Sequence, residues 1–517
     1  MEILNKVVFI AFGSVALASA ASAGGSSKPT YAKDIAPILN ENCVVCHRPG
    51  ETAPMSLTTY DEVRPWAKAI AKNVGERIMP PWHADKGIGV FSNDRSLDDD
   101  KIATIVRWVD QGATRGELKD LPPSPTFPTG DWKLGPPDLE IAFKKVDLPA
   151  GGPDQFFNLE HTLDLPSDRW VRAVEIRPTN RKVTHHVIVY QTENLDTPPN
   201  GWLGAWAAGA EPMQFPEGTG RLVKKNGILI GDMHYHPADS PQSEETRIGL
   251  HFAADSSIKK EVVNLWLDNR TFEIPAGNPS FTANSTFSFP QDSVILSVMP
   301  HMHYRGRSFK YVATYPNGRS DVLMSTSNYD FNWQTNYVFK KPIKVPRGTQ
   351  IECVAEWDNS ADNPRNPDPT KNVKFGSAST DEMMIGFVDY VVKDGTRPES
   401  PTDQIAKILA ELAAAHPGDV YEATLIDNAP DPRPAPSALY LPREGEGTWQ
   451  IAIDGRLFDG TLTALAWQDN AVTARAKMGV LGTSDFAATI DAATGKIDGT
   501  ISEKNAVLAE FHGTRVK

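Results

Sequence analysis

The sequence has little cysteine, with 3 residues among 517. So few cysteines exclude a fold held together by several disulfides. The sequence also lacks an excess of positive charge, because its formal net charge is −13. Since an acidic chain has no general basic surface for phosphates, nucleic-acid binding is not expected. The 40% hydrophobic and 23% charged residues are typical of a globular protein, and at roughly 150 residues per domain the length predicts about three or four domains.

Long apolar runs are missing beyond the N-terminus. A membrane-spanning helix needs roughly 18 consecutive apolar residues, so no membrane span is expected in the mature chain. Residues 1–23 combine Lys6, the apolar run Val7–Phe12 and small residues ending at Ala23, which is the pattern of a secretory signal peptide. We therefore expect a periplasmic or secreted protein. An uncleaved N-terminal anchor is the alternative.

Helical and β patterns occupy different parts of the chain. Between Tyr31 and Gly116 the pattern is helical, and one amphipathic helix is expected to start at Ser96-x-x-Asp99 and end before Gly112. Its apolar face consists of Ile102, Ile105, Val106 and Val109. After a Pro-rich stretch, short β-branched or aromatic runs predict strands at Trp170–Ile176, Val183–Tyr190, Gly227–Met233, Val294–Met299, Gln350–Trp357 and Ile385–Val392.

Two of the three cysteines belong to a haem motif. Cys43-Val44-Val45-Cys46-His47 is C-x-x-C-H, in which the two thiols attach covalently to the porphyrin and the histidine binds one axial face of the iron. A redox disulfide with a bystander histidine is the alternative interpretation. The sixth iron ligand is predicted to be Met79, in the rigid sequence Met79-Pro80-Pro81-Trp82, with Met55 and His83 as competitors. The segment Tyr31–Gly116 resembles small class I cytochrome c domains through these two elements.

Half of the 12 histidines lie in three short motifs, His185-His186, His234-Tyr235-His236 and His301-Met302-His303. Residues i and i+2 of a strand face the same way, so the outer histidines of the second and third motifs can present two imidazoles to one metal. Adjacent His185 and His186 would face opposite ways unless a bulge or strong twist intervenes.

Imidazole suits Zn, Cu, Fe or Ni, so histidine alone does not select the metal. A thioether beside two histidines favours Cu(I), and Asp381-Glu382-Met383-Met384 supplies methionine just before a predicted strand. A zinc hydrolase is a further possibility from histidine alone, although it leaves the haem motif unexplained.

The ordered motifs His-His, Met-His-Tyr, His-x-His and Asp-Glu-Met resemble the copper type II, ascorbate-dependent monooxygenases, the family of peptidylglycine α-hydroxylating monooxygenase and dopamine β-monooxygenase. The resemblance covers roughly residues 138–395. It implies two β-sandwich domains that face each other across a cleft. It also implies an electron-transfer copper held by His185, His186 and His234, and a catalytic copper held by His301, His303 and Met383, where O2 hydroxylates a substrate C–H bond.

The sequence departs from this family at several positions. His236 could replace His234, and Met384 could replace Met383. The amidating branch grips a peptide carboxylate with an arginine two residues before His-x-His, where this chain has Met299. Its Asn and Tyr after the methionine ligand correspond to Ile385 and Phe387. These changes argue against a peptide carboxylate as substrate and indicate an apolar pocket wall. The disulfides of the animal members are absent too, and Cys353 is interpreted as a buried apolar thiol.

Taken together, these features predict a multidomain, mainly β chain. In order, we expect a signal peptide (1–23), an α-helical cytochrome c-like haem domain (24–120), a Pro-rich linker (121–137), two antiparallel β-sandwich copper domains (138–277 and 278–397), a helix with a Pro-rich linker (398–442), and a small antiparallel β domain of unknown role (443–517).

The expected function is exported, copper-dependent monooxygenation of a small organic substrate, with haem c (covalent) as the electron donor to two mononuclear coppers. The haem in turn would be reduced by an exported partner, which could be a cytochrome, a quinol-linked protein or an ascorbate-like reductant. The alternative is a haem and copper electron-transfer or copper-handling protein without substrate oxidation. Copper nitrite reduction is weaker, because Cys353 has no neighbouring histidines for a blue-copper site.

Overall fold

The computed structural model describes residues 28–51, 53–127, 132–192, 201–207, 209–376, 378–395, 401–416, 419–427, 434–453, 456–477, 483–503 and 506–516. The predicted signal peptide, residues 1–23, lies outside these residues. The chain divides into two compact units, of which the first comprises 1–80 and 97–125 and the second 81–96 and 126–517. Strands dominate the structure. Among the described residues, no helix is long and apolar enough to cross a membrane.

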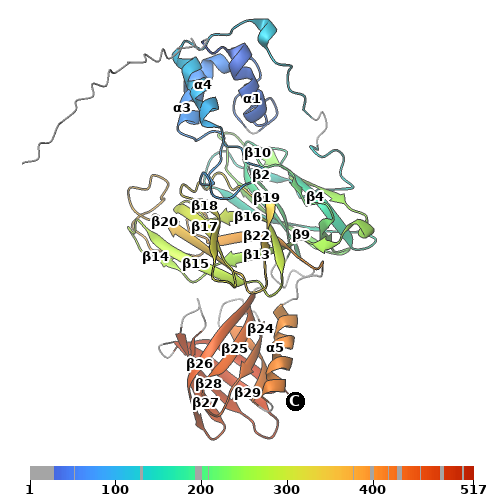
Figure 1. Cartoon of the computed structure of the whole chain (residues 1–517), viewed down its shortest axis with the longest axis vertical. Coiled ribbons are helices and arrows are strands. Elements are labelled where there is room, and N and C mark those ends of the chain that lie inside the picture. Colours follow the sequence, from blue (N-terminus) through green and yellow to red (C-terminus); the bar gives the residue numbers. More distant parts are fainter. Residues whose placement is uncertain are drawn as a thin grey trace, which may run out of the picture. The chain divides into compact units, whose positions relative to one another are not determined.

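The first unit is helical, as the sequence predicts (blue in Figure 1). The predicted amphipathic helix forms as α4 and ends before Gly112, but it begins after Asp98 rather than at Ser96, whose backbone N–H donates to Asp94. Ile105 and Trp108 are its most deeply buried residues. The helices are η1 (Tyr31–Ile35), α1 (Ala36–Asn42), α2 (Tyr60–Val63), η2 (Arg64–Trp66), α3 (Ala67–Gly75), α4 (Asp99–Asp110) and η3 (Leu118–Asp120).

The second unit begins its β structure with a first pair of sheets. One sheet has the order β1-β11-β4-β8-β12, with β7 beside β4, and the other has the order β3-β9-β5-β6. Their shared core includes Val187, Met233 and Leu250. The strands are β1 (Leu139–Ala142), β2 (Val146–Leu148), β3 (Gln155–Thr162), β4 (Arg169–Arg177), β5 (Thr184–Thr192), β6 (Gly201–Ala207), β7 (Met213–Gln214), β8 (Thr219–Val223), β9 (Ile228–Tyr235), β10 (Gln242–Glu244), β11 (Arg247–Phe252) and β12 (Lys260–Glu261).

A second pair of sheets follows, with orders β13-β22-β16-β19 and β15-β20-β17-β18 (Figure 1). The first pair of sheets ends and the second begins near Val262. The sequence places this boundary at 277/278 instead, in the Pro275–Ser280 turn, but that turn lies between β13 and β15 of the second pair. The strands are β13 (Val263–Asp268), β14 (Glu273–Ile274), β15 (Phe281–Ser288), β16 (Ser293–His301), β17 (Gly306–Thr314), β18 (Ser320–Thr326), β19 (Tyr337–Val345), β20 (Gln350–Trp357), β21 (Val373–Lys374) and β22 (Ile385–Val392).

All six predicted strands are present, as β4, β5, β9, β16, β20 and β22. β22 is buried along its whole length. Its two faces contact different apolar clusters, because Val388 packs in the core of the second pair whereas Phe387 packs against Ile188 and Trp202 of the first pair. Burial on both faces explains why this strand is a continuous apolar run rather than an alternating one.

Residues 81–96 leave the helical unit and pack on the second pair of sheets; we call this segment the strap. Trp82 contacts Tyr337 with ring centroids 4.9 Å apart, and Phe91 forms an isolated bridge with Phe339. The Asp85 carboxylate accepts from the Ser325 hydroxyl at 2.5 Å. The strap is therefore an ordered part of the second unit.

The C-terminal part is a closed barrel of β23–β30 (orange and red in Figure 1), where the sequence predicts a small antiparallel β domain. It begins at Val420, so part of the expected Pro-rich linker is strand β24. Pro434 and Pro436 fit there because that part of β24 pairs with β23 alone, and its pairing with β25 begins only at Ser437. A missing N–H is tolerated where one side of a strand has no partner. The elements are α5 (Pro401–Ala415), β23 (Val420–Asp427), β24 (Pro434–Tyr440), β25 (Gly447–Ile453), β26 (Arg456–Gln468), β27 (Ala471–Lys477), β28 (Thr483–Ile490), β29 (Lys496–Glu503) and β30 (Ala506–Arg515).

Candidate metal centres

The first centre lies where β5 and β9 pair. His186 is opposite His234 in the register, and the register shifts between Thr184 and His186, so His185 is the extra residue of a β-bulge. This bulge is the irregularity that two adjacent histidines need in order to turn toward one site. The ring centroids of His185 and His234 are 4.6 Å apart, and those of His186 and His234 are 4.9 Å apart.

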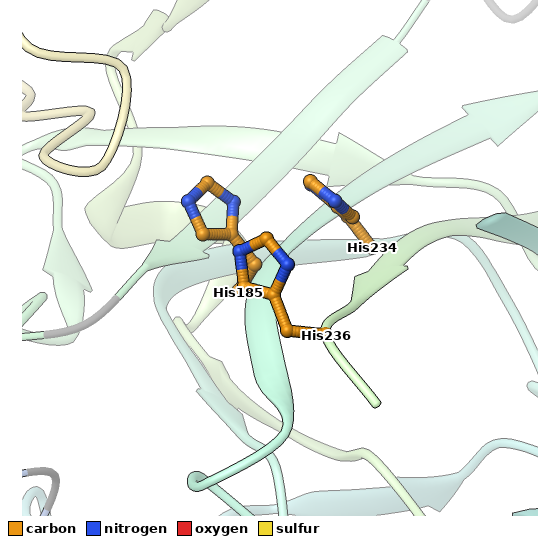
Figure 2. Close-up of side chains that lie close together, drawn as sticks. All are labelled: His185, His234 and His236. Carbon is orange, nitrogen blue, oxygen red and sulfur yellow. The ribbon is translucent and has the colours of Figure 1, made fainter. Parts of the chain in front are cut away.

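His236 joins this group from the residue after β9. Ligand nitrogens of His185, His234 and His236 all lie within 4.8 Å of one another, and Figure 2 shows the three rings turned toward one region. The Nδ1 atoms of His185 and His186 are 3.0 Å apart. The structure thus gathers all four histidines of the two motifs, and the three whose ligand nitrogens come together around one position are His185, His234 and His236.

The Asp154 carboxylate orients two of these rings. It accepts from His234 Nε2 at 2.8 Å and from His236 Nδ1 at 2.5 Å. His234 Nδ1 is buried and has no hydrogen-bond partner. A histidine that donates one ring N–H to a carboxylate and leaves its other nitrogen free is the usual arrangement of a metal ligand. Burial raises the pKa of Asp154, but its hydrogen bonds with His234 and His236 outweigh burial and hold the pKa below its usual value.

Burial keeps five histidines of the two centres neutral. It lowers the pKa of His185 to about 3, that of His303 to about 3 and that of His301 to about 4. It also lowers the pKa of His234 and brings that of His186 well below its usual value. Neutral imidazole is the form that binds metal ions.

The second centre lies at the end of β16. His301 and His303 are buried with ring centroids 5.3 Å apart, while Met302 between them points into the core of the second pair of sheets. His301 Nδ1 donates to the Gln334 side-chain carbonyl at 2.8 Å, which leaves Nε2 to bind a ligand. His303 Nδ1 donates to the Asp381 carbonyl at 3.3 Å.

The two candidate methionines differ in their surroundings. Met384 is fully buried in the core of the second pair of sheets. Met383 packs instead in the apolar cluster with Met299 and Phe387, and Phe387 lies 6.4 Å from the His301 ring. Met383 thus shares a cluster with Phe387, the neighbour of the His301 ring, whereas Met384 is a core residue.

Glu382 connects the two chain segments of this centre. Its carboxylate accepts from the backbone N–H of His303 at 2.9 Å, from that of Arg305 at 2.6 Å and from Trp357 Nε1 at 3.0 Å. Burial raises its pKa to about 7. Because Glu382 directly precedes Met383, these bonds fix the methionine segment against the histidine segment.

The two centres are neighbours. The Phe331 ring lies 4.9 Å from His185 and 5.6 Å from His303, so one aromatic side chain contacts a histidine of each centre. The Tyr304 hydroxyl donates to Asp154 at 3.2 Å, which links the carboxylate of the first centre to the residue after His303.

The haem motif lies in the first unit, directly after α1. His47 Nδ1 donates to the Met55 carbonyl at 3.3 Å, so the free nitrogen of the ring is Nε2, as an axial ligand of haem iron requires. Cys43, Cys46 and Met79 belong to this same unit, whereas His83 belongs to the strap and hence to the second unit. The donors of the motif fit a covalent haem with a histidine axial ligand.

Asp154, Gln334, Tyr304 and Phe331 escape prediction from the sequence. Each is an isolated residue without a motif, and each reaches its histidine partner only through folding. Glu382 carries a weak signal, because it lies inside the Asp-Glu-Met motif, but its hydrogen bonds to residues about 80 positions earlier are a tertiary feature.

No family model matches the sequence. Among solved structures, the chain is similar to a structure of the infectious bursal disease virus Gx strain, at a TM-score of 0.18 and 9% identity over 52% of this chain and 77% of that chain. It is also similar to the VP2 subviral particle of infectious bursal disease virus, at a TM-score of 0.14 and 9% identity over 54% of this chain and 88% of that chain. Similarities this weak assign no function.

Proposed function

We propose that this chain is an exported copper-dependent monooxygenase that hydroxylates a C–H bond of a small organic molecule with O2, receiving its electrons through a c-type haem. The main support is the convergence of three histidine motifs on two neighbouring sites, with Met383 in the apolar cluster next to the second. In this proposal the two pairs of sheets are the β-sandwich copper domains, and the helical unit is the cytochrome c domain.

The proposed donor sets favour copper over other metals. The first site offers imidazole nitrogens oriented by a carboxylate. The second offers two imidazoles, to which Met383 of the neighbouring apolar cluster would add a thioether. Soft sulfur stabilises Cu(I). When bound, copper would supply one-electron redox chemistry at each centre and O2 activation at the centre with Met383.

The side chains around the centres would position the ligands and exclude water. Gln334 and the Asp381 carbonyl fix the ring tautomers of His301 and His303. The apolar cluster of Met299, Ile385 and Phe387 covers one side of the second centre. A dry wall of this kind suits a reaction at an unactivated C–H bond, since it keeps water away from the reacting atoms.

The reaction consumes a C–H compound, O2, two electrons and two protons, and yields an alcohol and water. A c-type haem carries one electron at a time, which matches one-electron storage at each copper. The electrons would come from an exported donor, such as a cytochrome, a quinol-linked protein or an ascorbate-like reductant.

Labelled oxygen tests this function. The copper- and haem-loaded protein is incubated with 18O2, a reductant and metabolite mixtures, and products are analysed by mass spectrometry. We expect one 18O atom in an organic product, lost in His303→Ala and Met383→Ala while the haem spectrum stays unchanged. Redox cycling of copper without any labelled product would instead indicate an electron-transfer or copper-handling protein.

A further inference from the structure

A pocket of about 320 Å³ lies in the second unit, between the two pairs of sheets and the strap. Its lining includes His186 of the first centre and Gln334, which hydrogen-bonds to His301 of the second. Residues 81, 92, 93 and 95 of the strap form part of its wall. A molecule in this pocket would therefore lie close to both centres.

Most of the wall is apolar and aromatic. Trp202, Trp206, Phe215, Met299 and Phe339 all line the pocket. A volume near the lower end of the range of ligand pockets, together with aromatic walls, suits one small molecule with one or two rings.

The charges around the pocket leave no buried group to neutralise an ionic ligand. Asp389 is buried and already forms an ion pair with Arg221. The Arg221 guanidinium also lies over the rings of Trp202 and Phe215, at 4.7 and 4.9 Å. The other charged lining residues, Arg95 and Glu211, are not buried and have opposite signs. Transferring an ion among these aromatic rings would cost its hydration without compensation.

One polar group of the wall lacks a partner. Trp202 is 3% exposed, and its indole N–H is buried without a hydrogen-bond acceptor. Because this N–H is covered by other atoms, a ligand in the pocket does not reach it, and Trp202 contributes only its apolar ring to the wall.

We propose that this pocket binds the substrate, and that the substrate is an uncharged aromatic molecule. The inference rests on the proposed function only in calling the ligand a substrate. Binding of the ligand in the pocket does not depend on the metals. His186 and Gln334 on the wall place the bound ring near both histidine centres.

Isothermal titration calorimetry of the full-length, copper-free protein tests the inference. The probes are 2-naphthol, 2-naphthoate and 2-naphthylmethylammonium at pH 7, which share one ring system and differ in charge. We expect 2-naphthol to bind at least about tenfold more tightly than either ion. Equal or tighter binding of an ion, or no binding of 2-naphthol, would overturn the proposal.

Two variants locate the site. Ala205→Phe fills the pocket and should abolish 2-naphthol binding. Trp202→Leu keeps an apolar side chain but removes the aromatic ring from the wall, so it should weaken 2-naphthol binding by about 2- to 10-fold. The control Trp66→Leu, in the helical unit, should leave 2-naphthol binding unchanged. Unchanged 2-naphthol binding in Trp202→Leu would contradict the assignment even if Ala205→Phe does not fold.

The outcome separates this inference from the proposed function. Selective binding without any 18O-labelled product would leave the pocket in place and refute the monooxygenase. An 18O-labelled product that forms equally fast in Ala205→Phe would instead support the monooxygenase and refute this pocket as its substrate site.

Discussion

Asp154 is the residue on which the geometry of the first centre depends most. It accepts from His234 and His236 and is also reached by Tyr304. We expect Asp154→Asn to weaken copper binding at this centre by about 10- to 100-fold, because loss of a supporting carboxylate lowers ligand basicity and frees the rings. Copper retained per chain during dialysis against a graded chelator measures the change.

The matched control is Asp147→Asn, which removes an exposed carboxylate on β2. It should retain as much copper as the unmodified protein. If Asp154→Asn also binds copper normally, the carboxylate does not support the metal ligands, and the assignment of His234 Nδ1 as the free ligand atom loses its basis.

Asp232 gives a pH-dependent prediction. Burial raises its pKa from 3.8 to about 6, so folding favours the protonated form. Below pH 3.8 the carboxyl is protonated in both states and costs the folded state no free energy. As the pH rises from 3.8 through 6, the unfolded state ionises first, so the free energy of unfolding falls. In copper-free protein, Asp232→Asn should raise the free energy of unfolding by on the order of 1–3 kcal/mol at pH 7.5 and leave it nearly unchanged at pH 4.

Urea unfolding at the two pH values measures this difference. A stabilisation that is equal at pH 4 and pH 7.5 would show that the ionisation of Asp232 is not its cause.

Which histidines come together could be predicted better than which residues support them. His301 and His303 come together as their spacing predicts, although only His301 is in β16 and His303 lies two residues beyond its end. The bulge at His185 follows from the need to bring two adjacent rings together. The choice between Met383 and Met384 could not be made from the sequence, because both are apolar and adjacent, and only packing places one in the core and the other in the cluster of Phe387.

At the scale of elements, a buried ion pair joins the two pairs of sheets. Arg221 on β8 pairs with Asp389 on β22, which also accepts from Asn264 at 2.7 Å and Ser297 at 3.2 Å. Removing one partner leaves an uncompensated buried charge, so Arg221→Met should lower the free energy of unfolding by about 3–5 kcal/mol. Denaturant unfolding followed by tryptophan fluorescence measures it.

The double variant Arg221→Met with Asp389→Leu should recover much of this loss, since no buried charge remains. Arg475→Met, which breaks the exposed pair with Asp485, should change stability little. A similar small effect from Arg221→Met would contradict a role for the buried pair in holding the sheets together.

Strand prediction succeeded where sequence and packing agree. β20 alternates between the core and the outside, and β22 is apolar throughout because both of its faces are covered. Prediction missed β24, since its prolines indicate a linker and become compatible with a strand only beside a free edge. It also missed the strap, whose aromatic contacts with β19 involve residues about 250 positions apart.

For the whole molecule, the proposal requires electrons to pass from the unit with the haem motif to the unit with the histidine centres. Reduced haem should therefore be reoxidised faster when copper, O2 and an oxidisable substrate are all present than when any one is omitted. Stopped-flow absorbance of the haem measures the rate. A rate that does not depend on copper would refute the relay.

In the proposed function these side chains hold copper at two centres, one with nitrogen ligands and one that also has the Met383 sulfur. X-ray absorption at the copper edge of the reduced protein tests it most directly. We predict about two coppers per chain, with imidazole ligands and a sulfur signal that disappears in Met383→Leu and persists in Met384→Leu. Zinc in place of copper, or a sulfur signal that survives Met383→Leu, would contradict the account.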